Sequence, residues 1–202
     1  MTVKVGIFVF PDVEVLDFAG PYEVFTTAAR VSLRQNPAAG RPFEVFTVAE
    51  SAATFKARAG LTVLPDFAFG QHPAIDLLIV PGGVVTAELE KPVVVDWIAA
   101  TAVQARITAA VCTGAFLLGQ AGLLDGRRAT THWEDIADLR RDFPQIDVIA
   151  DRRWVDEGSV VTSGGISAGI DMSLHLVERL AGRDLALRTA RQMEYRWDEA
   201  IS

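Results

Sequence analysis

The sequence lacks several features that define whole classes of protein. It has one cysteine in 202 residues, so it forms no internal disulfide, which is consistent with a reducing compartment. Its 19 lysines and arginines are outnumbered by 26 aspartates and glutamates, so the basic footprint of a nucleic-acid-binding protein is missing. No apolar run reaches the roughly 18 residues of a membrane span, and the N-terminus has no signal-peptide pattern. We therefore expect a cytoplasmic protein with no nucleic-acid partner and no membrane partner.

Metal and cofactor signatures are also missing. No group of histidine, cysteine, aspartate and glutamate has the spacing of a metal site, so no metal is expected. Gly164, Gly165 and Gly169 lack the pattern and the downstream acidic residue of a dinucleotide-binding loop. The sequence thus predicts chemistry by side chains alone, without a cofactor.

Alternating strands and helices run through the whole chain. Half of the residues are hydrophobic, enough for a sizeable core, and no linker or repeat divides residues 1–202, so we expect one domain. The alternation predicts an α/β fold with a doubly wound, mostly parallel sheet and helices on both faces. The predicted strands are 3–10, 43–49, 76–80, 106–111, a short one near 129, 147–154 and 160–163, with a short hairpin or loop at 61–64. The predicted helices are 21–29, a turn at 86–90, 92–105, 113–121, 135–143, 170–180 and 184–195.

Cys112 lies where a predicted strand changes directly into a helix. Residues 106–111 are small, apolar and β-branched, as in a buried strand, and residues 113–121 have helical spacing. Such an abrupt change projects the turning side chain at the carboxyl end of the sheet, where a nucleophile elbow places its nucleophile. Gly114 allows close backbone packing behind the bend. Cys112 is therefore the candidate nucleophile, although a small buried cysteine without chemistry is the common alternative.

Two other segments directly follow predicted strands and are expected near the same edge of the sheet. Asp17 follows the first strand and precedes a helix that we expect to begin near Pro21, where capping is an ordinary role for aspartate. Gly82 and Gly83 follow the strand 76–80 and leave the backbone free to point N–H groups into a pocket. An ordinary tight turn is the alternative for this pair.

Five motifs in order resemble the ThiJ/PfpI superfamily, the flavodoxin-like family that includes the Parkinson-associated protein, and look closest to its isocyanide hydratase branch. They are Leu16-Asp17-Phe18-Ala19-Gly20-Pro21, Val80-Pro81-Gly82-Gly83, Val111-Cys112-Thr113-Gly114-Ala115, Ala129-Thr130-Thr131-His132-Trp133 and Ser163-Gly164-Gly165-Ile166-Ser167-Ala168-Gly169-Ile170-Asp171. The sequence departs from the hydratase pattern at Val84-Val85-Thr86, where further glycines are usual.

The resemblance implies that Asp17 points at Cys112. Two anions in a semi-buried site are unfavourable, so we expect a shared proton, with a raised aspartate pKa and a lowered cysteine pKa. The N–H groups of Gly83 and Thr113 are the expected oxyanion donors, and the Thr113 hydroxyl is a candidate partner of the sulfur or of water. Gly82, Gly114 and His132 are candidate pocket residues.

The role of His132 stays open at this stage. It either acts directly in catalysis or, with Trp133, shapes the pocket or a dimer contact. His72 and His175 are expected to be structural or surface groups.

The resemblance implies a homodimer that acts on a small molecule, and several functions fit the residues. The first is hydration of an isocyanide to an N-substituted formamide through a cysteine thioimidate. Other activities of the same superfamily are glyoxalase, amidase and protease-like chemistry. A redox or stress sensor that oxidises Cys112, or a ligand-binding regulator, needs no catalysis.

Overall fold

A parallel sheet forms the centre of the molecule. A computed structural model describes residues 2–197, without the side chain of Ala39. Within residues 2–197 the main sheet has seven strands in the order β10-β11-β7-β6-β1-β2-β5, and β10 alone is antiparallel to its neighbour. The strands are β1 (Val3–Phe8), β2 (Phe43–Ala49), β5 (Phe67–Ala68), β6 (Leu77–Val80), β7 (Ile107–Val111), β10 (Trp154–Asp156) and β11 (Val160–Ser163).

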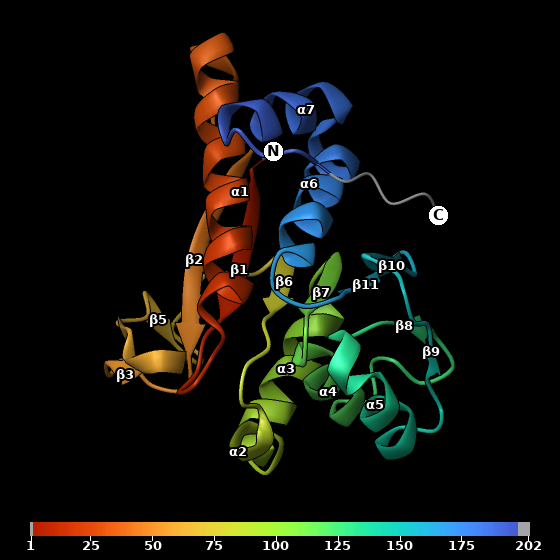
Figure 1. Cartoon of the computed structure of the whole chain (residues 1–202). Coiled ribbons are helices and arrows are strands. Elements are labelled where there is room, and N and C mark those ends of the chain that lie inside the picture. The colour runs from red at the N-terminus through yellow and green to blue at the C-terminus, as the bar shows by residue number, and fades with distance from the viewer. Residues whose placement is uncertain (1, 198–202) are drawn as a thin grey trace.

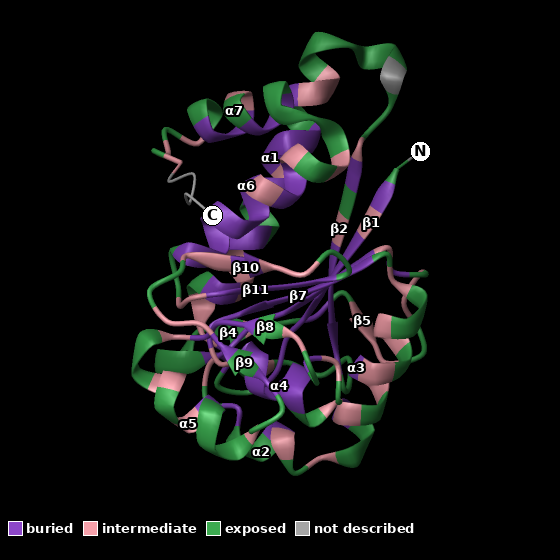
Figure 2. Ribbon diagram, turned by 90° about the vertical axis from the view of Figure 1, so that its right-hand side faces the viewer, coloured by how far each residue is buried: buried purple, intermediate pink, exposed green. Residues whose placement is uncertain are grey.

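Helices cover both faces of this sheet. Helices α1, α6 and α7 lie on one side, and α3, α4 and α5 lie on the other (Figures 1 and 2). The helices are α1 (Val15–Gln35), α2 (Thr86–Leu89), α3 (Pro92–Gln104), α4 (Gly114–Gln120), α5 (Ile136–Asp142), α6 (Ala168–Ala181) and α7 (Arg183–Gln192). Strands β6 and β7 are buried at every position because both of their faces are covered, which explains their continuous apolar sequences. None of the described helices has both the length and the apolar character of a membrane span.

The order of the strands places a crevice at the carboxyl ends of β1 and β6. The chain passes from β1 through α1 to β2 on one face, and from β6 through α3 to β7 on the other. Adjacent strands whose connections leave in opposite directions form the switch point at which doubly wound folds bind ligands. The segments after β1, β6, β7 and β11 therefore converge here, and a backbone bridge between Val13 and Gly83 joins the first two.

The predicted fold class is confirmed, and most predicted elements are present. The prediction for the first helix was wrong: it begins at Val15, not near Pro21, so Asp17 lies in its first turn. A proline often marks the first helical position, but Pro21 sits inside this helix, where burial of apolar side chains such as Phe25 outweighs the lost backbone hydrogen bond.

The prediction of one late strand over residues 147–154 was also wrong. Strand β9 (Asp147–Val148) pairs with β8 (Arg128–Ala129) in a separate small sheet, and β10 pairs with β11. Asp151, which lies between β9 and β10, has a φ of +58°, so the extended backbone is interrupted there. The short hairpin or loop expected at 61–64 is part of a hairpin of β3 (Phe55–Lys56) and β4 (Thr62–Val63), which is followed by the edge strand β5.

Candidate active site

Cys112 occupies the predicted elbow between β7 and α4. Its φ is +57°, in the left-handed region that residues other than glycine rarely adopt. Long-range hydrogen bonds hold it there: its N–H donates to the carbonyls of Ser163 at 3.1 Å and Gly164 at 3.3 Å, and its carbonyl accepts from the Thr131 hydroxyl at 2.8 Å. The side chain is only 8% exposed, yet it lines a cavity. Local strain held by long-range contacts is typical of a functional position.

Two glycines allow the loops around the elbow to approach closely. A Cβ at Gly114 would lie 2.1 Å from the Val80 carbonyl oxygen, and one at Gly82 would lie 2.6 Å from the Thr113 nitrogen. The close packing expected behind the bend is therefore present. Neither glycine is among the described residues that line the cavity next to Cys112, and their role as pocket residues stays a prediction.

Asp17 is fully buried, and it reaches Cys112 as expected from the resemblance. Its carboxyl group interacts with the Cys112 side chain, and each group changes the pKa of the other. Its two carboxyl oxygens also accept backbone N–H groups, from Gly82 at 3.2 Å and from Ile166 at 3.2 Å. Three loops thus converge on one carboxyl group, which fixes its position against the sulfur.

The pKa of Asp17 is raised, and the pKa of Cys112 is raised as well. Burial is the largest cause for Asp17 and brings its pKa to about 7, despite its backbone hydrogen bonds. Burial and then the charge of Asp17 bring the pKa of the Cys112 thiol to about 12. The aspartate prediction is confirmed and the lowered cysteine pKa is wrong, because the single N–H of Thr113 does not offset burial beside a carboxylate.

Thr113 connects the elbow to the loop after β6. Its hydroxyl accepts the Gly83 N–H at 2.9 Å and donates to the Gly83 carbonyl at 2.9 Å. The predicted hydroxyl contact with sulfur or water is thus replaced by a bridge to Gly83. The Gly83 N–H is engaged by this hydroxyl, so in this conformation it is not free to act as an oxyanion donor. The Thr113 N–H instead acts on the Cys112 thiol, whose pKa it lowers.

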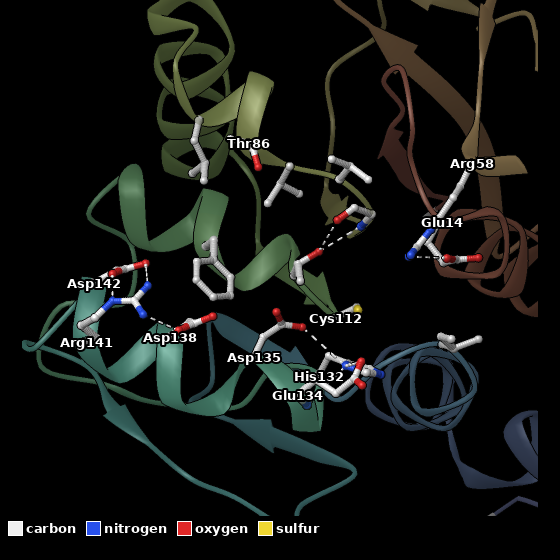
Figure 3. Close-up of a pocket in the computed structure, with 17 residues that line it drawn as sticks. Glu14, Arg58, Thr86, Cys112, His132, Glu134, Asp135, Asp138, Arg141 and Asp142 are labelled. Carbon is white, nitrogen blue, oxygen red and sulfur yellow. Dashed lines mark hydrogen bonds and ion pairs between the residues drawn. The ribbon is translucent and has the colours of Figure 1, made fainter.

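The Cys112 cavity is the space of about 530 Å³ above the sulfur (Figure 3). Its walls come from the loop after β6, the start of α4, the segment that leads into α5, and the loop after β11. Val84, Val85 and Thr86 all line it, so the departure from the hydratase pattern falls on the pocket wall itself. Within residues 2–197, no group of three or more ligating side chains is placed to hold a metal ion.

His132 lines the same cavity, and its ring is held from two sides. Its Nδ1 lies 3.4 Å from the Asp135 carboxylate, and its ring packs on Gly165, where a Cβ would approach to 2.1 Å. This position fits either of its predicted roles. The other histidines have structural partners: His72 bonds to Trp97, and His175 bonds to Asp156.

Sequence reasoning missed three residues of the site. Ile166 supplies a backbone donor to Asp17 from 149 residues away, with a φ of +55°. The buried Thr131 anchors the elbow, and Asp135 orients His132. Ile166 and Thr131 lie in two of the quoted motifs, so the motifs marked these segments, but the contacts follow from the fold.

Comparisons with a family model and with curated proteins agree on one family. The model of the DJ-1/PfpI family matches residues 3–179. The isonitrile hydratase of Pseudomonas putida is 36% identical over 198 residues, covering 96% of this chain and 79% of that protein. The HTH-type transcriptional regulator GbdR of Pseudomonas aeruginosa is 37% identical over 136 residues, covering 67% of this chain and 37% of the regulator.

Solved structures agree with the sequence relatives. A ThiJ/PfpI family protein from Pseudomonas syringae superposes with a TM-score of 0.84 at 27% identity, covering all of this chain and 78% of the other. Drosophila melanogaster DJ-1beta superposes with a TM-score of 0.82 at 19% identity, covering 98% of this chain and 100% of the other. This similarity shows a shared fold. The extent of the family match and of the hydratase identity shows that this chain belongs to the DJ-1/PfpI family.

Proposed function

We propose that this chain catalyses the hydration of an isocyanide to an N-substituted formamide, with Cys112 as the nucleophile. The observation that carries the proposal is that Cys112 lines an open cavity and has the buried carboxyl group of Asp17 beside it. Similarity to an isonitrile hydratase over nearly the whole chain supports the choice of substrate. The following steps use only groups that line or touch this pair.

The first step adds the S–H bond of Cys112 to the terminal carbon of the isocyanide. The sulfur bonds to this carbon while its proton passes to Asp17, which then protonates the same carbon and leaves a thioimidate. A carboxyl group with a pKa of about 7 suits this exchange, because near neutral pH it both accepts and returns a proton. The high pKa of the thiol is compatible with the step, since the proton leaves as the bond forms.

The second step hydrolyses the thioimidate. Water adds to the carbon, a proton reaches the nitrogen, and the carbon–sulfur bond breaks to release the formamide and the thiol. In this scheme Asp17 moves these protons, and the Thr113 N–H stabilises charge on the departing sulfur. The net reaction consumes one isocyanide and one water, and it regenerates the Cys112–Asp17 pair.

Non-enzymatic alternatives fit the site less well. A redox sensor needs a thiolate, but burial and Asp17 raise the pKa of Cys112 to about 12, which disfavours oxidation. A ligand-binding regulator has specific support, because part of the chain matches the regulator GbdR. Such a regulator would bind its ligand in the same cavity without turning it over.

Turnover of a neutral alkyl isocyanide tests the proposal. Loss of the isocyanide stretch in the infrared and appearance of the formamide in proton NMR measure the reaction, with methylglyoxal and a simple amide assayed in parallel. We expect turnover by the parent and loss of at least about 10³-fold in Cys112→Ala. Turnover that survives in Cys112→Ala contradicts the mechanism. Binding of isocyanide without consumption by the parent supports the regulator instead.

We also propose that residues 1–202 form one domain and that two copies pair as a homodimer. The family resemblance motivates the second part. Sedimentation equilibrium measures it directly, and a monomer at micromolar concentration contradicts it.

A further inference from the structure

The Cys112 cavity has an uneven distribution of charge. Five carboxylates and two guanidiniums line it, a net charge of −3 with His132 neutral. Four of the carboxylates lie on one side, on the segment that leads into α5 and on α5 itself (Figure 3). We name this side the acidic wall, and its carboxylates are Glu134, Asp135, Asp138 and Asp142.

The two arginines already have partners within the cavity lining. Arg58 pairs with Glu14 at 3.2 Å, on the side away from the acidic wall. Arg141 pairs with Asp142 at 2.7 Å and with Asp138. Neither arginine pairs with Asp135, whose described ion-pair contact is the imidazole of His132, a ring that also lies 3.6 Å from Glu134.

Asp135 is the member of the acidic wall that reaches deepest. Its side chain is 33% exposed, against 64% for Glu134 and 50% for Asp138. It projects between Cys112 and Asp138 in Figure 3. Burial is the largest cause that raises the pKa of Asp135, and the charges of Asp138 and Glu134 raise it further. The Asp135 charge in turn contributes to the raised pKa of Cys112, so it acts across the reaction centre.

The rest of the lining is largely apolar. Val84, Val85, Leu89, Phe116 and Ile166 line the cavity together with Cys112. A bound molecule therefore meets hydrocarbon on one side and surplus negative charge on the other. A neutral alkyl group fits only the first of these surfaces.

We propose that Asp135 is a specificity-determining residue that selects substrates with an apolar body and a positively charged group, and that it disfavours anionic ones. The preferred substrate is then an isocyanide that carries an ammonium group. This identification of the substrate rests on the proposed function. The preference for charge itself follows from the cavity and holds for any electrophile that reaches Cys112. A cation beside Asp135 also offsets a charge that disfavours the Cys112 thiolate.

Charge-matched thiol reagents test the preference without relying on turnover. Methanethiosulfonates with trimethylammonium-ethyl, methyl and sulfonato-ethyl groups each form a mixed disulfide with Cys112 and release methanesulfinate. The labelling rate of each is divided by its rate with 2-mercaptoethanol. We expect the cationic reagent to exceed the anionic one by about tenfold or more at low ionic strength, and the ratio to shrink in high salt.

Variants separate the role of Asp135 from a general effect of net charge. Asp135→Asn should reduce the cation-to-anion ratio by about three- to tenfold, and Asp135→Glu should largely retain it. Glu44→Gln removes one charge at the amino end of β2, at the opposite end of the sheet, and should leave the ratio unchanged. A ratio equal to that of the free thiol, or one that Asp135→Asn does not change, overturns the proposal. Because the parent ratio is measured separately, the test survives a variant that does not fold.

A second assay compares isocyanides that carry trimethylammonium, tert-butyl and carboxylate groups on one linker. We expect kcat/KM to fall in that order in the parent and the difference to narrow in Asp135→Asn. Equal values for the three substrates overturn the specificity and leave the hydratase function standing. No turnover of any isocyanide, with selective labelling intact, refutes the hydratase function and leaves the charge preference supported.

Discussion

Asp17 and Asp135 are two carboxylates that act on the same sulfur from different surroundings. Asp17 is fully buried, and three loops hold it through backbone N–H groups and the Cys112 side chain. Asp135 is one-third exposed on the acidic wall and lies among like charges, with His132 as its partner. Burial is the main cause of the raised pKa in both cases. The difference is that Asp17 is placed against the Cys112 side chain, whereas Asp135 acts on the Cys112 thiol through its charge alone.

The largest expected difference between the two carboxylates is in catalysis. Asp17→Asn should lower kcat/KM for an isocyanide by about 10² to 10⁴-fold, because it removes the group that moves protons. In the parent, kcat/KM should rise with pH up to about 7, as Asp17 ionises, and then level off. Asp135→Asn should retain this rise. The pH profile of both variants is the measurement, and an unchanged rise in Asp17→Asn removes Asp17 from the mechanism.

Stability as a function of pH should show the next largest difference. The pKa of Asp17 rises from 3.8 to about 7 on folding, so its contribution is fully present below pH 3.8 and is lost as pH rises through 7. Between pH 4 and 8, the stability of the parent relative to Asp17→Asn should fall by on the order of 4 kcal/mol. Denaturant unfolding at several pH values measures this. A constant difference contradicts it, and Glu44→Gln serves as the matched control.

The bridge made by Thr113 should have a smaller effect than Asp17. Thr113→Val keeps the shape but removes the hydroxyl that joins the elbow to Gly83, which should cost about 1–2 kcal/mol of stability. Because the elbow loses its link to Gly83, Cys112 is held less precisely, and kcat/KM should also fall by about tenfold. Thr113→Ser should restore most of both. If the serine variant is as impaired as the valine variant, packing of the methyl group is responsible instead.

The smallest expected effect concerns the thiol itself. The charge of Asp17 and, less strongly, the charge of Asp135 both raise the pKa of Cys112. Each asparagine variant should therefore lower that pKa, with the larger change in Asp17→Asn. Ultraviolet absorbance of the thiolate, measured against pH in both variants and in the parent, gives the order of the three Cys112 pKa values. Identical titration curves for the parent and Asp17→Asn refute the proton-sharing pair.

Several features of the site could be predicted from the sequence because they depend on residues that are neighbours in the chain. The strand-to-helix change at Cys112 and the need for a small residue at Gly114 depend on neighbours in the chain, and both predictions were confirmed. The start of the first helix could not be predicted correctly. Pro21 is a strong local signal for a helix start, but burial of the helix in the folded protein outweighs it. The contact between Ile166 and Asp17 spans 149 residues, beyond any local pattern.

The sequence by itself determined the parallel α/β fold, the family and the position of the lone cysteine at an elbow, because periodicity and motifs are properties of neighbouring residues. The tertiary structure alone decided the direction in which the pKa of Cys112 is shifted. A pKa depends on burial and on charges that converge from distant segments. The raised pKa of Cys112, the engagement of Gly83 by Thr113 and the place of Asp135 in the same cavity as Cys112 therefore required the assembled sheet.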